Sequence, residues 1–110
     1  MHVLLDEGID IKLRHYFNEG IAVETVQFRG WKGIKNGALL RLAEMAYNVF
    51  VTLDQSIPNQ QNITRFDLAI VVLRPRSQRL VDLIELIPEL ERILPTLRSG
   101  EVARIYPPSA

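Results

Sequence analysis

The sequence contains no cysteine, so disulfide bonds and thiolate metal sites are both excluded. It also has no apolar segment of the length that a membrane-spanning helix requires. The amino-terminal residues lack the basic region and the long apolar stretch of a secretion signal. These absences fit a reducing compartment, and we expect a cytoplasmic protein.

Net charge is lacking as well, because 13 basic side chains balance 13 acidic ones. Bulk charge therefore gives no indication of nucleic-acid binding. The local balance is uneven, and two segments carry basic residues without any acid: Arg29, Lys32, Lys35 and Arg41 in the first, and Arg74, Arg76 and Arg79 in the second. Such clusters can bind phosphate groups, but they are more often solvated loop charges.

What the sequence does contain is a regular alternation of strand-like and helix-like segments. Apolar or β-branched runs predict strands at 3–5, 21–28, 49–53, 68–73 and 102–106. Helical spacing predicts helices at 9–17, 36–47 and 77–97, with prolines that should kink the last one or split it in two. This order predicts a single α/β domain over residues 1–106, a three-layer αβα sandwich with a mostly parallel sheet of about five strands. Residues 107–110 are expected to form a flexible tail.

Acidic residues follow two of these strands. Asp6 and Glu7 come after the first strand, and Asp54 comes after the third. If these strands are neighbours, about 4.8 Å apart, the three acids could form one site at the carboxyl edge of the sheet. A ligand set of oxygens without thiolates predicts Mg²⁺ or Mn²⁺. The alternative is structural, with Asp6 capping a helix and Asp54 opening a turn.

Other polar residues admit two interpretations each. Asn36 is a metal ligand or the N-cap of the second helix, and the two roles are compatible. Trp31 could stack a nucleic-acid base beside Lys32 and Lys35, or it could anchor its loop on the sheet. The amides of the segment 60–62 could line the mouth of the site or belong to an ordinary polar loop.

Three motifs, taken together, resemble the compact PIN-like domains of bacteria. They are Val3-Leu4-Leu5-Asp6-Glu7, Gly33-Ile34-Lys35-Asn36-Gly37 and Val51-Thr52-Leu53-Asp54-Gln55, and the resemblance covers nearly the whole chain. Many members of that family are regarded as toxin ribonucleases encoded beside a small antitoxin. The resemblance implies a Mg²⁺-dependent endoribonuclease with Asp6 and Asp54 as catalytic metal ligands. Asn36 stands where many relatives have an acid.

RNA is the substrate that this resemblance implies, with Arg29, Trp31, Lys32 and Lys35 as the RNA-binding residues. Candidate protein partners are an antitoxin and further copies of the chain. A second interpretation is a non-catalytic PIN-like module that binds a partner protein, which the polar loop and the missing acid favour. A third is a phosphoacceptor receiver domain, which requires a hydroxyl residue after the fourth strand and a lysine after the fifth. This chain has Arg74-Pro75 and Tyr106-Pro107 there.

Overall fold

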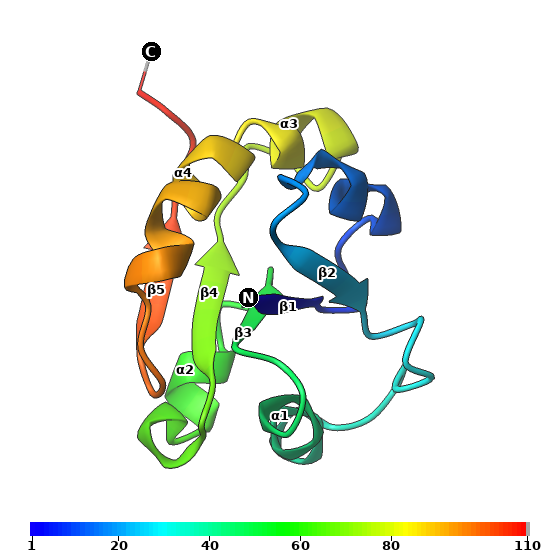
Figure 1. Cartoon of the computed structure of the whole chain (residues 1–110), viewed down its shortest axis with the longest axis vertical. Coiled ribbons are helices and arrows are strands. Elements are labelled where there is room, and N and C mark those ends of the chain that lie inside the picture. Colours follow the sequence, from blue (N-terminus) through cyan, green and yellow to red (C-terminus); the bar gives the residue numbers. More distant parts are fainter. Residues whose placement is uncertain (110) are drawn as a thin grey trace.

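A five-stranded parallel sheet forms the centre of the protein (Figure 1). The computed structural model describes residues 1–109. The strands are β1 (His2–Leu5), β2 (Ala22–Thr25), β3 (Val49–Thr52), β4 (Ala69–Leu73) and β5 (Val102–Ile105). They lie in the order β2-β1-β3-β4-β5, and each neighbouring pair is parallel. This is one of the two common strand orders of doubly wound α/β sheets.

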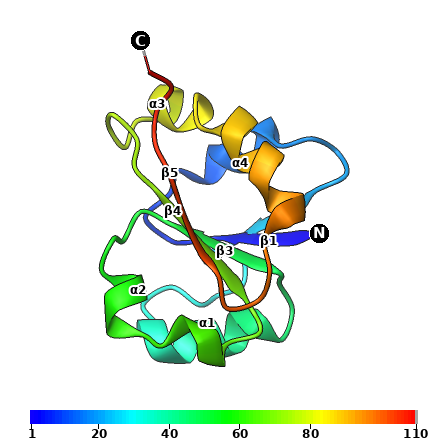
Figure 2. The same cartoon turned by 90° about the vertical axis from the view of Figure 1, so that its left-hand side faces the viewer.

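Helices cover both faces of this sheet, as Figure 2 shows. One face carries η1 (Ile11–Tyr16), α3 (Leu80–Ile84), α4 (Ile87–Ile93) and η3 (Leu94–Thr96), where η denotes a 3₁₀ helix. The opposite face carries α1 (Asn36–Glu44), α2 (Ile57–Gln60) and η2 (Ile63–Arg65). The predicted three-layer αβα sandwich with a mostly parallel sheet is therefore confirmed. Within residues 1–109, no helix has the length and apolar character needed to cross a membrane.

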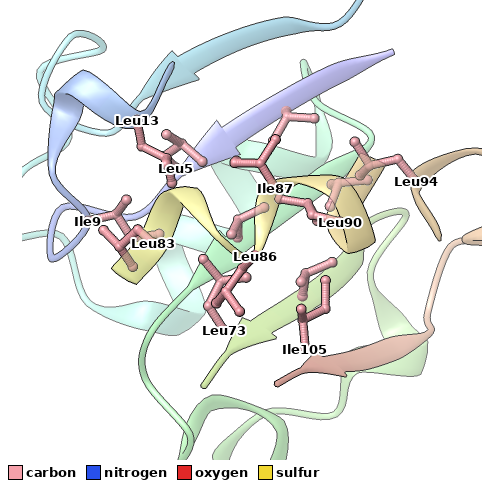
Figure 3. Packing of buried hydrophobic residues seen from close by; sticks show 14 of the residues in the cluster. Leu5, Ile9, Leu13, Leu73, Leu83, Leu86, Ile87, Leu90, Leu94 and Ile105 are labelled. Atoms are coloured by element: carbon pink, nitrogen blue, oxygen red, sulfur yellow. The ribbon is translucent and has the colours of Figure 1, made fainter. Parts of the chain in front are cut away.

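The two faces of the sheet bury two separate hydrophobic clusters. Side chains alternate along each strand, so Val3 and Leu5 belong to one cluster and Leu4 belongs to the other. Figure 3 shows the first cluster, in which helix residues such as Leu83 pack onto the strands. The second cluster includes Phe50, which is fully buried. Burial on both faces explains why the central strands β1, β3 and β4 appear in the sequence as apolar runs.

Several helices are shorter than their apolar patterns predict. The segment 9–17 forms only η1, and the helix predicted at 36–47 ends at Glu44. The long segment 77–97 is divided into α3, α4 and η3, which confirms that its prolines interrupt it. Pro88 and Pro95 each occupy a first or second helical position, where a proline removes no helical hydrogen bond.

Two other segments also differ from prediction. The second strand, predicted at 21–28, ends at Thr25 because a turn follows it. In that turn the Thr25 carbonyl accepts a hydrogen bond from Arg29 N, and the Thr25 hydroxyl accepts one from Phe28 N. The polar stretch 55–64, where no helix is predicted, contains α2 and the start of η2. Pro58 lies at a favoured proline position near the start of α2, so it begins this helix rather than breaking it.

The segment after β5 has no regular secondary structure up to Ser109. The Pro108 carbonyl accepts a hydrogen bond of 3.0 Å from Arg76 Nη2, which connects this segment to the loop after β4. Of the flexible tail predicted at 107–110, residue 110 lies outside the described residues.

Gly100 is expected to accept a side chain only with a loss of stability. Its φ is +85°, a left-handed conformation, and an added Cβ would lie 3.3 Å from Thr64 Cα. Gly100→Ala should therefore lower the free energy of unfolding in urea by about 1–2 kcal/mol, the cost of this conformation for other residues. Gly20→Ala is the matched control, because Gly20 lacks a positive φ and no atom lies within 4 Å of an added Cβ. Equal urea midpoints for the two variants would contradict this expectation.

Candidate metal centre

The carboxyl ends of β1 and β3 lie side by side, and from there the chain continues in opposite directions. β1 leads into η1 on one face of the sheet, and β3 leads into α2 on the other face. Such a divergence of neighbouring strands marks the usual ligand site of doubly wound sheets. Asp6 is the first residue after β1, and Asp54 is the second residue after β3. The structure therefore brings both predicted acids to this point.

Asp6 is a half-buried carboxylate held by two hydrogen bonds. Its Oδ2 accepts from Thr52 Oγ1 at 2.7 Å, and its Oδ1 accepts from Glu7 N at 2.8 Å. Burial raises the pKa of Asp6 above its ordinary value, and the charges of Glu7 and Asp54 add to this rise, while the two hydrogen bonds oppose it. The negative form of Asp6 is therefore costly in the folded protein, and a nearby cation would stabilise it.

Asp54 is exposed and lies in a different environment. Its Oδ1 accepts hydrogen bonds from Ser56 Oγ at 2.6 Å and from Ser56 N at 2.9 Å. The bonds from Ser56 hold the pKa of Asp54 below its ordinary value, and the side chain of Asn36 adds to this lowering. Asp54 is thus ionised at neutral pH, and the Asn36 side chain lies beside it.

Thr52 connects the two acids, and it is the site residue that the sequence analysis missed. Its hydroxyl donates to Asp6 and accepts a hydrogen bond of 3.0 Å from Asp54 N. The side chain is fully buried. In the sequence Thr52 resembles any β-branched strand residue, so only the adjacency of β1 and β3 reveals this role. The available signal was a hydroxyl residue in an otherwise apolar strand, two positions before an acid.

Glu7 is turned toward the loop that follows β2. Its Oε1 accepts a hydrogen bond of 3.1 Å from Gly33 N, and its carbonyl accepts one of 2.8 Å from Gln27 Nε2. The Oε1 of Gln27 is buried without a hydrogen-bond partner among the described residues. Within residues 1–109, no group of three or more Asp, Glu, His or Cys side chains is arranged to hold a metal ion. The two aspartates are therefore the acids on which a metal site here depends.

Asn36 is not the N-cap of α1, so that part of its prediction is wrong. The helix begins at Asn36 itself, and Lys35 occupies the N-cap position without a side-chain hydrogen bond. The Asn36 side chain instead lies close enough to Asp54 to contribute to the lowering of its pKa. The amide of Gln61 packs over the neighbouring Gly37, where an added Cβ would lie 3.4 Å from Gln61 Oε1. Two amide side chains thus gather at the start of α1.

The four residues predicted to bind RNA fall into two groups. The guanidinium of Arg29 lies 4.2 Å from the centroid of the Trp31 ring and donates a hydrogen bond of 2.8 Å to Tyr47 Oη. Trp31 meets Tyr47 edge-on and packs against the second hydrophobic cluster, so it anchors its loop. Lys32 and Lys35 are exposed, and Lys35 directly precedes the start of α1. The two lysines are therefore better placed than Trp31 to meet a ligand.

The donor set fits a small, hard cation. Asp6 and Asp54 offer carboxylate oxygens, Asn36 offers an amide oxygen, and proteins often bind Mg²⁺ through one or two carboxylates with water completing its shell. Neither aspartate forms a salt bridge with a basic side chain of residues 1–109. The raised pKa of Asp6 and its repulsion by Asp54 would both be relieved by a bound cation.

No protein-family model, curated protein or solved structure matches the chain. Three features of the chain's own residues define this site. These are a half-buried acid, an exposed acid beside an amide, and the buried hydroxyl that joins the two acids.

Proposed function

We propose that the protein is a Mg²⁺-dependent endoribonuclease of the PIN-like type, acting in the cytoplasm as the toxin of a toxin–antitoxin pair. The observation that carries this proposal is the pair Asp6 and Asp54, joined through Thr52 where β1 and β3 diverge. A half-buried carboxylate with a raised pKa, and without a basic partner in residues 1–109, is typical of a site built for a cation. The resemblance of three motifs to PIN-like domains supports nuclease chemistry there.

Each residue of the site has a distinct task in this proposal. Asp6 and Asp54 hold the ion, and Thr52 fixes the orientation of the Asp6 carboxylate through its hydroxyl. Asn36 supplies an amide oxygen beside Asp54. A bound Mg²⁺ ion would supply an activated water and stabilise negative charge on the phosphate. The exposed Lys35 would attract the RNA backbone toward the start of α1.

A non-catalytic PIN-like module that binds a partner protein is the second candidate function. The observation that favours it is the orientation of Glu7, whose carboxylate accepts a hydrogen bond from Gly33 N. The site then has two acids, whereas PIN-like nucleases generally assemble a larger set. Receiver domains share this strand order, but the residues they require are absent, because Arg74 follows β4 and Tyr106 follows β5.

The test of the nuclease proposal is cleavage of RNA by the purified protein. We expect single-stranded RNA to be cut with millimolar Mg²⁺ and to stay intact with EDTA. A double variant, Asp6→Asn with Asp54→Asn, controls for contaminating ribonuclease and should be inactive. Asp10→Asn is the matched control at an acid outside the site. Asp10 caps η1, and asparagine caps a helix equally well, so this variant should still cleave RNA. If the wild type cuts no RNA in Mg²⁺, the catalytic proposal fails and the binding module remains.

A further inference from the structure

A polar cavity lies on the same edge of the sheet, one strand away from the acids. It has a volume of about 290 Å³, and its polar lining consists of Gln55, Arg74, Ser77, Gln78 and Tyr106. Leu53 and Gln55, which flank Asp54 in the sequence, also line it. Arg74 follows β4, the strand next to β3. The cavity therefore adjoins the candidate metal centre, but none of its lining residues is acidic.

Arg74 gives this cavity its positive charge. The two arginines that follow it have acidic partners, since Arg76 lies 2.8 Å from Glu85 and Arg79 lies 4.0 Å from Asp82. Arg74 is half-buried and forms no salt bridge with an acidic side chain of residues 1–109. Guanidinium groups bind phosphate through paired hydrogen bonds, and no acidic side chain of residues 1–109 occupies the guanidinium of Arg74. The cavity is therefore suited to an anion, and to a phosphate in particular.

Tyr106 places an aromatic ring beside this guanidinium. Leu73 and Ile105 are paired at the ends of β4 and β5 (Figure 3), so Arg74 and Tyr106 leave the sheet together. The guanidinium carbon of Arg74 lies 5.5 Å from the centroid of the Tyr106 ring. Tyr106 is 56% exposed, which leaves ring surface available to a ligand. Exposed aromatic rings beside a positive charge stack the bases of single-stranded nucleic acids.

We propose that this cavity binds one unpaired nucleotide, with its phosphate on Arg74 and its base against Tyr106. Ligand sites commonly measure about 300–1,000 Å³. A cavity of about 290 Å³ lies just below this range, so it is suited to no more than a single nucleotide. The amides of Gln55 and Gln78 can donate to and accept from the base or the sugar. The assignment of this nucleotide to an RNA strand rests on the proposed nuclease function. In that case the adjoining acids would act on the same strand.

Binding of adenosine 5′-monophosphate, adenosine and a short single-stranded oligoadenylate tests this proposal, with EDTA present and chemical-shift titration as the readout. The wild type should bind the monophosphate more tightly than adenosine. Arg74→Gln should weaken monophosphate binding by about tenfold or more and leave adenosine binding nearly unchanged. Tyr106→Leu should weaken the binding of both ligands by about fivefold or more. Arg79→Gln is the matched control, since Arg79 is exposed and does not line the cavity.

The same titrations identify the source of the nucleotide. Oligoadenylate binding that is much tighter than monophosphate binding, and that Arg74→Gln weakens, supports an RNA strand. Equal affinities that Arg74→Gln weakens support a free mononucleotide in the same site. The proposal would be overturned if Arg74→Gln and Arg79→Gln changed the affinity for the monophosphate equally. It would also be overturned if the resonances of Arg74 and Tyr106 did not shift in the folded wild type.

These measurements stay separate from the test of the nuclease proposal. They require no metal, and they can be repeated in the variant that lacks both Asp6 and Asp54. Retained nucleotide binding without RNA cleavage refutes the nuclease alone. Cleavage that Arg74→Gln leaves intact, together with monophosphate binding that it does not weaken, refutes the nucleotide site alone.

Discussion

Replacing Asp6 with asparagine is expected to weaken Mg²⁺ binding by about 100-fold or more, since even partners of metal ligands contribute about 10- to 100-fold to affinity. The same substitution should make the metal-free protein more stable. Asparagine has a similar shape without the charge, and its single acceptor oxygen keeps one of the two hydrogen bonds from Thr52 and Glu7. The burial penalty on the charge of Asp6 outweighs both of those bonds. The gain in the free energy of unfolding should be on the order of 1 kcal/mol, the size of a typical single substitution. Metal binding and stability therefore change in opposite directions.

The stability difference should depend on pH with a defined sign. The pKa of Asp6 is raised in the folded protein, so folding favours the protonated carboxyl. The stabilisation from protonated Asp6 is complete below its ordinary pKa of 3.8 and is lost as the pH rises through the folded-state pKa. The advantage of Asp6→Asn over the wild type should therefore be largest near neutral pH and should shrink as the pH falls toward 3.8.

Urea unfolding at several pH values, with EDTA or with excess Mg²⁺, measures both effects. Mg²⁺ should close the gap between the two proteins, because only the wild type binds the ion tightly. Asp54→Asn is the matched control. The pKa of Asp54 is lowered, so its carboxylate stabilises the fold above its ordinary pKa, and this stabilisation is lost as the pH falls through the folded-state pKa. Asp54→Asn should thus destabilise the protein at neutral pH, and equal stabilities of the two variants in EDTA would contradict the prediction.

Asn36→Asp is expected to raise Mg²⁺ affinity and RNA cleavage together, each by about tenfold or more, the lower end of what a well-placed metal-site group contributes. The Asn36 side chain already lies beside Asp54, so an aspartate there would add a carboxylate to the proposed metal centre. Without metal, the added charge should raise the pKa of Asp54, because like charges disfavour ionisation. Calorimetric titration with Mg²⁺ and a fluorescent RNA cleavage assay measure the two gains.

The new aspartate would also face the positive end of the α1 dipole, which needs a separate control. Ala38→Asp supplies it, because Ala38 lies in the same first turn of α1 and is exposed. That variant adds the same charge to the same helix terminus, but about 200° around the helix from Asn36, so metal affinity and cleavage should stay at the wild-type level. If both variants gained equally in Mg²⁺ affinity and in RNA cleavage, the cause would be general electrostatics. Asn36 would then not belong to the metal centre.

The acids at the strand ends could be predicted because the sequence carries both of the necessary signals. Continuous apolar runs identify buried parallel strands, and Asp6 and Asp54 follow two of them within two residues. The prediction of a shared site assumed that the first and third strands are neighbours, which the sequence alone does not show. The structure shows that β1 pairs with β3, with Leu5 opposite Val51.

The remaining parts of the site depend on contacts that no local pattern encodes. Thr52 joins the two acids only because β1 and β3 are neighbours. Asn36 has a sequence position typical of a helix cap, but α1 begins at Asn36 itself, and its side chain interacts with Asp54. Trp31 fits the alternative interpretation of a loop anchor, because Tyr47 returns to it from the far end of α1. These are tertiary effects, and they override local propensity where residues distant in the sequence meet.

The hydrogen bond between Thr52 and Asp6 joins residues 46 positions apart, which has a consequence for the order of folding. Neighbouring parallel strands cannot be joined by a tight hairpin, so β1 and β3 meet only after a long loop has closed. Contacts of such long sequence separation form slowly compared with local helical ones. During synthesis the two acids therefore stay apart until β3 has left the ribosome and paired with β1. The candidate metal centre is therefore complete only when the middle of the sheet has formed, so a partly folded chain would lack it.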